Sequence, residues 1–340
     1  MTERGLAPAP AVDPAPVLDV RDLVMEFRSR DAVITANANV SLTVSRGMTL
    51  GVVGESGSGK SVLCRNILRL IPSPPGFTVA GEVWFEGRDL LTLSEKEMER
   101  VRGTKIKMVF QNPMTSLNAV WPVGDQVTEG LRVHYGLSSR EAREQGIELL
   151  RRVGIPSPKQ RYDEYPYQWS GGMLQRAVIA MAMAGEPKLL LADEPTTALD
   201  VTIQDQILAL LLEIQNRTDM AMILVSHDMA VIAETCDTVA VMYAGQIMEL
   251  APTQRLFESP RHPYTFGLLS SIPRFAENAG RLSPIPGQPP NLADLPAGCP
   301  FAERCRFASG DCVDTPVYLK EVEPGHSTAC LYPQRLSEGA

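Results

Sequence analysis

The residues with the clearest chemical meaning form a glycine-rich segment, Gly54-Glu55-Ser56-Gly57-Ser58-Gly59-Lys60-Ser61. It follows the β-rich run Thr49–Val53 and precedes an apolar stretch with helical spacing, which is the setting of a phosphate-binding loop. Glycines let backbone N–H groups converge on phosphate oxygens, and the helix N-terminus adds its positive dipole end. We therefore expect nucleotide phosphates to lie against Gly54, Ser56, Gly57, Ser58 and Gly59, with Lys60 at the β- and γ-phosphates and Ser61 on Mg²⁺.

Two carboxylates follow a second apolar run. Leu189–Ala192 is continuously apolar, which is typical of a parallel strand buried on both faces, and Asp193 and Glu194 come directly after it. Taken alone, an acidic pair after an apolar strand is structural about as often as it is catalytic. Downstream of a phosphate-binding loop, Asp193 can hold Mg²⁺ through water and Glu194 can polarise an attacking water, so the pair predicts ATP hydrolysis.

Further motifs resemble those of one family. The segment from Ser170 to Arg176, which begins Ser170-Gly171-Gly172, is similar to the signature sequence of ABC ATPases. In the family's order, Gln111 matches the Q-loop, Ala198-Leu199-Asp200 the D-loop and His227 the switch histidine. Trp169 and Met173 stand where Leu and Gln are usual. The resemblance covers about residues 17–250 and implies an α/β P-loop ABC ATPase nucleotide-binding domain with a helical subdomain.

The resemblance also assigns roles to single residues. It implies that Gln111 senses Mg²⁺ and the γ-phosphate, and that His227 contacts the γ-phosphate and orients the hydrolytic water. Phe27, at the end of the first strand-like segment, is the candidate that stacks on adenine, although an ordinary core phenylalanine is nearly as good an interpretation. In this family the helical subdomain, expected at about residues 115–175, contacts a cytoplasmic helix of the membrane subunit.

The signature segment itself predicts a second anion site. Ser170, Gly171 and Gly172 precede the helical stretch Leu174–Ala184, where a hydroxyl and free N–H groups can bind phosphate. A chain with one phosphate-binding loop has no evident use for two such sites. The family resemblance implies that the second site serves a nucleotide bound by a partner subunit, so that two ATP molecules lie between two ATPase chains.

Other segments indicate the branch of the family. Phe110–Asn118 resembles the Q-loop region of dipeptide, oligopeptide and nickel importer ATPases, and His262-Pro263-Tyr264-Thr265 and Ile285–Pro290 match the layout of their tails. The resemblance implies a second ATPase subunit, more often a paralogue than a second copy, two transmembrane permease subunits and an external solute-binding protein. Import of nickel or glycosides, or a soluble ABC ATPase of iron–sulfur assembly, are the alternatives.

Four of the six cysteines, Cys299, Cys305, Cys312 and Cys330, crowd into the tail. Without an export signal a disulfide framework is disfavoured, so the set indicates a small Cys-rich module built on a metal site. Four thiolates can bind Zn²⁺ or a [4Fe–4S] cluster. The absence of a Cys-x-x-Cys pair argues mildly against zinc, and the resemblance to peptide importers favours the iron–sulfur cluster.

The elements that must position these residues follow from the pattern of the whole chain. Strand-like runs alternate with helical stretches from Val17 onward, which predicts an α/β fold. Residues 1–16 are an Ala/Pro-rich leader that we expect to be disordered, 17–250 the ATPase domain, and 251–340 a proline-rich module without a second hydrophobic core. The predicted strands are Thr49–Val53, Glu82–Phe85, Ile106–Phe110, Leu189–Ala192, Met222–Val225, Val239–Tyr243 and Gln246–Leu250.

Composition limits the partners. The formal net charge of −8 gives no sign of a nucleic-acid partner, which would favour a basic face. The longest apolar runs are too short to cross a bilayer, and no secretory signal is visible. We therefore expect a peripheral protein at the cytoplasmic face of the inner membrane.

Overall fold

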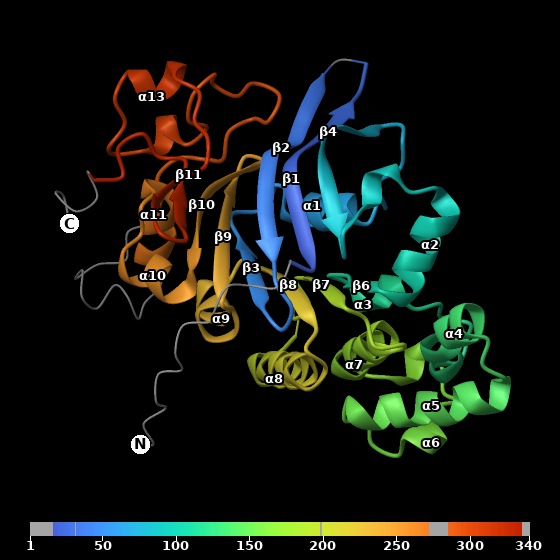
Figure 1. Cartoon of the computed structure of the whole chain (residues 1–340). Coiled ribbons are helices and arrows are strands. Elements are labelled where there is room, and N and C mark those ends of the chain that lie inside the picture. The colour runs from blue at the N-terminus through green and yellow to red at the C-terminus, as the bar shows by residue number, and fades with distance from the viewer. Residues whose placement is uncertain (1–15, 31, 198, 272–284, 335–340) are drawn as a thin grey trace.

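The computed structural model describes residues 16–30, 32–197, 199–271 and 285–334. Two β-sheets occupy the middle of the molecule, with a group of helices on one side and the C-terminal segment on the other (Figure 1). The expected leader lies outside the described residues except for its last position, and so does Ala198 of the expected D-loop.

The smaller sheet is antiparallel and has the strand order β2-β1-β4-β5. Its strands are β1 (Leu18–Arg28), β2 (Val33–Val44), β4 (Gly76–Phe85) and β5 (Arg88–Asp89). Alternate side chains of β1, Leu18 and Val20, are buried toward the larger sheet, as expected of strands with one face on a core.

The larger sheet has the order β11-β12-β10-β9-β3-β8-β7-β6 among the described strands. The five strands β9, β3, β8, β7 and β6 pair in parallel, whereas β10, β12 and β11 add antiparallel strands beside β9. The strands are β3 (Thr49–Val53), β6 (Ile106–Val109), β7 (Leu189–Asp193), β8 (Ala221–Ser226), β9 (Thr238–Tyr243), β10 (Gln246–Pro252), β11 (Lys320–Glu323) and β12 (His326–Thr328).

The strands predicted from the sequence are all present, but β4 begins at Gly76, six residues before the predicted start at Glu82. The differences at the other strand ends are small. β6 ends at Val109 rather than Phe110, and β10 continues to Pro252. β9 and β10 form a hairpin, and both turn residues, Ala244 and Gly245, have positive φ, as in a tight two-residue hairpin turn.

The larger sheet is covered on both faces, which explains its continuously apolar strands. Leu189 and Leu191 belong to a core shared with the smaller sheet, α1 (Lys60–Ile67) and α2 (Glu95–Thr104). Leu190, between them, points to the other face and packs in a core with helices. α8 (Val201–Thr218) belongs to that second face, and α9 (Met229–Thr235) lies beside β3 and β8.

The helices on one side of the molecule form an insert between β6 and β7 (Figure 1). Ser138 caps the N-terminus of its α5 helix, and Glu141 completes a capping box. The insert comprises α3 (Pro113–Ser116), α4 (Val123–Tyr135), α5 (Ser139–Arg152), α6 (Pro158–Arg161), a 3₁₀ turn (Pro166–Gln168) and α7 (Gly171–Met183). α7 therefore continues well beyond residue 175.

The C-terminal segment packs onto the ATPase domain, and its buried residues share a core with the sheet. β12 pairs with β10, so the segment extends the large sheet. Tyr264 and Phe301 are buried in one cluster with Leu224 and Val241 of the sheet. The proline-rich sequence of the tail gave no sign of this packing, because the sheet supplies most of the apolar surface that covers the tail residues. The helical elements are α10 (Thr253–Glu258), α11 (Pro263–Ser270), a 3₁₀ turn (Ala302–Arg304) and α13 (Asp311–Asp314).

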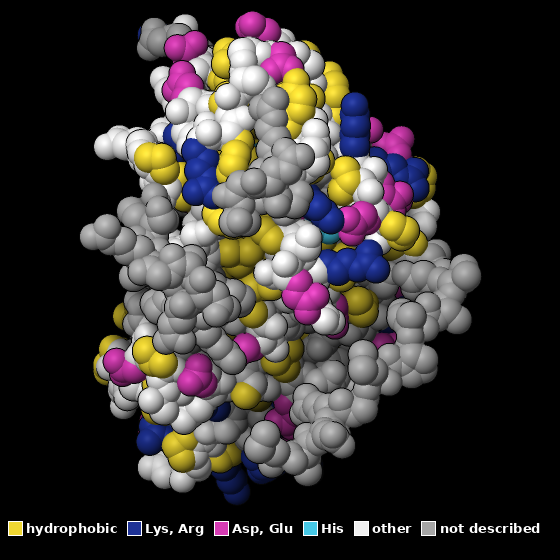
Figure 2. Space-filling view, turned by 90° about the vertical axis from the view of Figure 1, so that its left-hand side faces the viewer, with side chains coloured by type: hydrophobic (Ala, Val, Ile, Leu, Met, Phe, Trp, Pro, Cys, Tyr) yellow, Lys and Arg dark blue, Asp and Glu magenta, His cyan; other side chains and the backbone are white. Residues whose placement is uncertain are grey.

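Figure 2 shows the face of the molecule on the side of this segment, where acidic and basic side chains lie interspersed among apolar ones.

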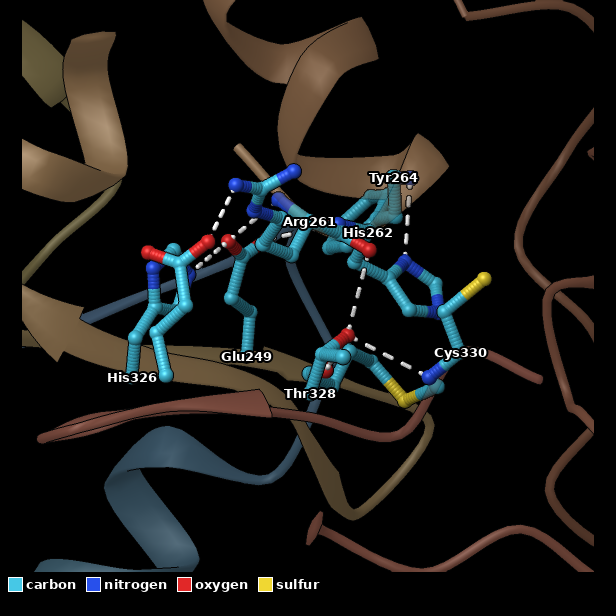
Figure 3. A network of polar contacts seen from close by, with 9 residues as sticks. Glu249, Arg261, His262, Tyr264, His326, Thr328 and Cys330 are labelled. Atoms are coloured by element: carbon cyan, nitrogen blue, oxygen red, sulfur yellow. Dashed lines mark hydrogen bonds and ion pairs between the residues drawn. The ribbon is translucent and has the colours of Figure 1, made fainter. Parts of the chain in front are cut away.

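A buried carboxylate joins the C-terminal segment to the sheet (Figure 3). Glu249 of β10 is 0% exposed and contacts His326 Nε2 at 2.7 Å. Its two oxygens also accept the backbone N–H groups of Arg261 and His262, at 2.6 and 2.9 Å. A buried carboxylate is stable only with such partners, so this network fixes the segment after β10 against β12.

Replacement of Glu249 by Gln should lower the free energy of unfolding by about 2 kcal/mol, because the amide turns an N–H₂ group toward buried donors. Chemical denaturation measures the change. The matched control is Glu258→Gln on the exposed face of α10, which should stay within about 0.5 kcal/mol of the wild type. Equal stability of the two variants would contradict the structural role of the network.

Candidate functional site

The candidate site lies at the carboxyl edge of the large sheet. β6, β7, β8 and β3 are neighbours and run parallel, so the loops after them emerge at the same edge. These loops carry the predicted site residues Gln111, Asp193, Glu194, His227 and the segment 54–61. The topology thus gathers groups that are distant in the sequence.

The glycine-rich segment connects β3 to α1, as predicted. Lys60 is 5% exposed, and its Nζ donates hydrogen bonds to the carbonyl oxygens of Gly54 and Glu55 at 2.7 and 2.9 Å and to Ser58 Oγ at 3.3 Å. Burial lowers the pKa of Lys60, while the charges of Glu194 and Asp193 act in the opposite direction. The loop thus carries a desolvated cation suited to binding phosphate.

Two glycines of the loop are required by close backbone contacts. A Cβ atom on Gly54 would lie 2.0 Å from the carbonyl oxygen of Met242, and one on Gly59 would lie 2.4 Å from that of Ala36. A side chain at either position would therefore displace the loop from β2 or β9.

Ser61, in the first turn of α1, and Asp193, at the end of β7, lie in contact. Their predicted shared role in binding Mg²⁺ requires this. Ser61 Oγ donates to Asp193 Oδ1 at 2.7 Å. Asp193 is 1% exposed, and burial raises its pKa while the Ser61 hydrogen bond and the cations Arg65 and Lys60 oppose that rise. A hydroxyl and a carboxylate side by side are hard oxygen ligands that can hold Mg²⁺, directly or through water.

Glu194 is the centre of a group of polar side chains. Its Oε2 accepts hydrogen bonds from Gln111 Nε2 at 2.8 Å and Thr197 Oγ1 at 2.9 Å, and lies 3.6 Å from His227 Nδ1. Its backbone has a positive φ of 47°, a conformation that non-glycine residues adopt at a cost and that is enriched at functional sites. The carboxylate is therefore held in one place by residues from three loops.

Thr197 was not among the predicted site residues. It follows Glu194 by three positions, and its backbone N–H closes a turn on the Glu194 carbonyl at 3.2 Å. A hydroxyl residue three positions after Glu194 was the only feature of the sequence that could have indicated this contact.

The signature residues lie on a different part of the surface. Ser170 begins α7, and its Oγ accepts the Met173 N–H at 3.4 Å. Gly171 and Gly172 lie against Leu199 and Ile203, near the start of α8. In the described residues, no hydrogen bond connects Ser170–Gly172 to the loop 54–61. Asp200 occupies the position before α8 without a side-chain capping bond.

Phe27 is part of the smaller sheet and pairs with Ile34 of β2 and Gly76 of β4. Its side chain is half-buried. The structure contains no contact that assigns it to adenine, so this role stays a prediction.

The four tail cysteines line one cavity of about 20 Å³, together with His262 and Phe301. Burial raises the pKa of Cys299 to about 12 and that of Cys330 to about 11, with the neighbouring cysteines adding to the rise. Across the described part of the chain, however, no group of three or more His, Cys, Asp or Glu is arranged to hold a metal ion. The expected [4Fe–4S] or zinc site is thus not supported by the arrangement of the side chains.

Helices long and apolar enough for a membrane span do not occur among the residues that the structure describes.

Two protein families match the chain. Residues 37–197 match the family described as ABC transporter, and residues 248–312 match the one described as oligopeptide/dipeptide transporter, C-terminal region. A "Probable peptide ABC transporter ATP-binding protein" of Sinorhizobium fredii is 50% identical over 92% of this chain and 94% of its own. The "Oligopeptide transport ATP-binding protein OppD" of Bacillus subtilis is 51% identical over 86% of this chain and 82% of its own.

Solved structures of ABC ATPases are similar to the ATPase domain of this chain. A dimeric ATP-binding cassette bound to ADP and Pi has a TM-score of 0.62 at 26% identity, covering 69% of this chain and 98% of its own. The cbiO1 protein of Clostridium perfringens, part of an ABC transporter complex, has a TM-score of 0.63 at 26% identity, covering 78% of this chain and 99% of its own. The chain therefore belongs to the ABC transporter family, as an ATP-hydrolysing subunit with the C-terminal region of oligopeptide/dipeptide transporters.

Proposed function

We propose that this chain hydrolyses MgATP at the carboxyl edge of its large sheet and thereby drives import of peptides through a membrane complex. The observation that carries the catalytic part is the convergence of Gln111, Thr197 and His227 on Glu194 Oε2. The peptide substrate is inferred from the relatives named for peptide transport and from the matching C-terminal region.

In the reaction, water attacks the γ-phosphorus, the bond from that phosphorus to the bridging oxygen breaks, and ADP and inorganic phosphate leave. Glu194 accepts the proton of the attacking water, and His227 and Gln111 orient the carboxylate and the water. The backbone N–H groups of the loop 54–61 and Lys60 hold the phosphates. Ser61, Asp193 and Gln111 would hold Mg²⁺, which would neutralise phosphate charge.

Replacement of Glu194 by Gln should lower kcat for ATP hydrolysis by about 100-fold or more, because an amide accepts no proton from water. The dissociation constant for MgATP should stay within about threefold of the wild type. Phosphate release and equilibrium binding measure the two effects, with Glu213→Gln on the exposed face of α8 as the control. Hydrolysis at the wild-type rate would remove Glu194 from the role of general base.

A second ATPase chain completes the proposed site. Ser170 is exposed at the N-terminus of α7, where its hydroxyl and the first N–H groups of the helix face solvent. We infer that these groups, with Gly171, Gly172 and Asp200, contact a nucleotide held by the partner chain. By the family resemblance the partner is more often a paralogue than a second copy.

The variant Ser170→Arg should slow hydrolysis by the ATPase pair by about 100-fold, since it removes an anion-binding cap at the γ-phosphate. Binding of MgATP to its own loop should change by less than about threefold. Ser138→Arg, which removes an exposed N-cap serine from α5, is the matched control for loss of a cap. Hydrolysis unaffected by Ser170→Arg would show that each chain works alone.

Two permease subunits and an external solute-binding protein are the further proposed partners. Apolar side chains of the helical insert close to Gln111 in sequence are exposed: Met114 by 61%, Val120 by 74% and Trp121 by 49%. Exposed apolar groups of this kind mark interaction surfaces. We infer that a cytoplasmic segment of the permease binds there and that the chain acts at the cytoplasmic face of the inner membrane.

The tail cysteines are proposed to bind a [4Fe–4S] cluster, with zinc as the alternative. The proposal rests on four thiols lining one cavity, since thiolates are the ligands that both metals take. The thiols must reorient before they can bind, because their present arrangement holds no metal. Binding would require loss of the thiol protons that burial favours, so a metal and protons would compete for these sulfur atoms.

Protein purified without oxygen should be brown and contain iron and sulfide, and Cys312→Ser should lose both. Cys236→Ala, at a buried cysteine distant in sequence from the tail, should keep them. Metal analysis and visible absorption decide between the outcomes. Zinc in a colourless protein would select the alternative, and protein without either metal would refute the proposed site.

A further inference from the structure

We infer that the C-terminal segment positions the phosphate-binding loop, with Arg304 and Tyr264 as positioning residues that act through Glu55. This inference rests on the proposed function, since it concerns the same ATP site. Arg304 and Tyr264 are distant in sequence from the loop.

Arg304 holds the side chain of Glu55 with two hydrogen bonds. Its Nη1 donates to Glu55 Oε2 at 2.6 Å and its Nη2 to Oε1 at 3.0 Å. The Arg304 side chain is only 7% exposed, so this bidentate pair is protected from water, unlike an ordinary surface ion pair. Glu55 has few competing orientations once this pair has formed.

Arg304 is itself fixed by the tail and the sheet. Its Nε donates to the Pro286 carbonyl at 2.8 Å, and its Nη1 also donates to Tyr243 Oη at 3.1 Å. Its guanidinium lies near the rings of Tyr243 and Phe301, at 5.7 and 5.9 Å from their centroids. Arg304 is therefore a fixed side chain, unlike a mobile arginine on the surface, and its loss would remove a rigid contact to Glu55.

Tyr264 holds the backbone of the same residue. The Glu55 N–H donates to Tyr264 Oη at 2.8 Å. Tyr264 is 0% exposed, and its ring packs against those of Tyr243 and Phe301, with centroids 4.6 and 5.3 Å away. The hydroxyl is thus a fixed acceptor supplied by α11.

Glu55 connects these two contacts to Lys60. The Glu55 carbonyl oxygen accepts from Lys60 Nζ at 2.9 Å, so its side chain, N–H and carbonyl all have partners. The C-terminal part of the loop has its own supports, because Gly59 lies against Ala36 and the Ser58 carbonyl accepts the Gly245 N–H at 3.0 Å. Between them, Ser56 and Gly57 are exposed, and space around Gly57 is open.

The tail contacts therefore hold the N-terminal half of a loop whose middle, Ser56 and Gly57, is exposed. Ordering a flexible loop during binding costs free energy, and a loop already held in place avoids much of that cost. Removal of the contacts should weaken ATP binding and leave the chemical step, which depends on Glu194, nearly unchanged.

Three variants test this in the full-length protein, assayed with its partner ATPase where hydrolysis requires one. Arg304→Met keeps the aliphatic stem, Tyr264→Phe removes only a hydroxyl, and Glu55→Gln acts from the loop side. Each should raise KM and the dissociation constant for MgATP by about three- to tenfold and change kcat by less than about twofold. The Arg304→Met/Glu55→Gln double variant should bind MgATP about as tightly as whichever single variant binds it less tightly. Both substitutions remove the same contact, the Arg304–Glu55 pair, so their effects should not add.

The control is Glu323→Gln, which removes the ion pair of the same segment with Arg261 and should leave KM for ATP within about twofold. Thermal unfolding verifies that each variant is folded. Wild-type hydrolysis in the same assay reports on the proposed function, and the variants report on the positioning role. Unchanged KM in all three variants, or fully additive effects in the double variant, would overturn the inference.

Discussion

Parallel pairing of β6, β7, β8 and β3 is the constraint on which the site depends. Parallel strands need both faces covered, and here the smaller sheet covers one face and the helices the other. The same pairing places the loops with Gln111, Glu194, His227 and Lys60 at one edge. Core packing and site geometry are thus consequences of one topology.

Opposite charges are buried together at that edge. Burial lowers the pKa of Lys60 and raises that of Asp193, while the opposite charges nearby and the Ser61 hydrogen bond to Asp193 act against both shifts. Such a site interacts strongly with phosphates and Mg²⁺, because little water screens the charges. The C-terminal segment adds the Arg304–Glu55 pair to the same loop, which makes the tail part of the ATPase domain's own architecture.

The sequence predicted the site better than it predicted the tail. Residues 54–61, Asp193 and Glu194 are recognisable because they adjoin strands with strong apolar patterns. Thr197 was missed since a hydroxyl three positions after a carboxylate is common. Burial of Tyr264 and Phe301 could not be predicted, because the apolar surface that covers them belongs to strands distant in the sequence.

A structure of the protein with its partner ATPase, Mg²⁺ and a non-hydrolysable ATP analogue tests the central claim most directly. We expect the phosphates within hydrogen-bond distance of the backbone of residues 57–61, the metal at Ser61 and Asp193, and the γ-phosphate also in contact with a signature serine of the second chain. A nucleotide bound elsewhere, or one enclosed by a single chain alone, would contradict the account.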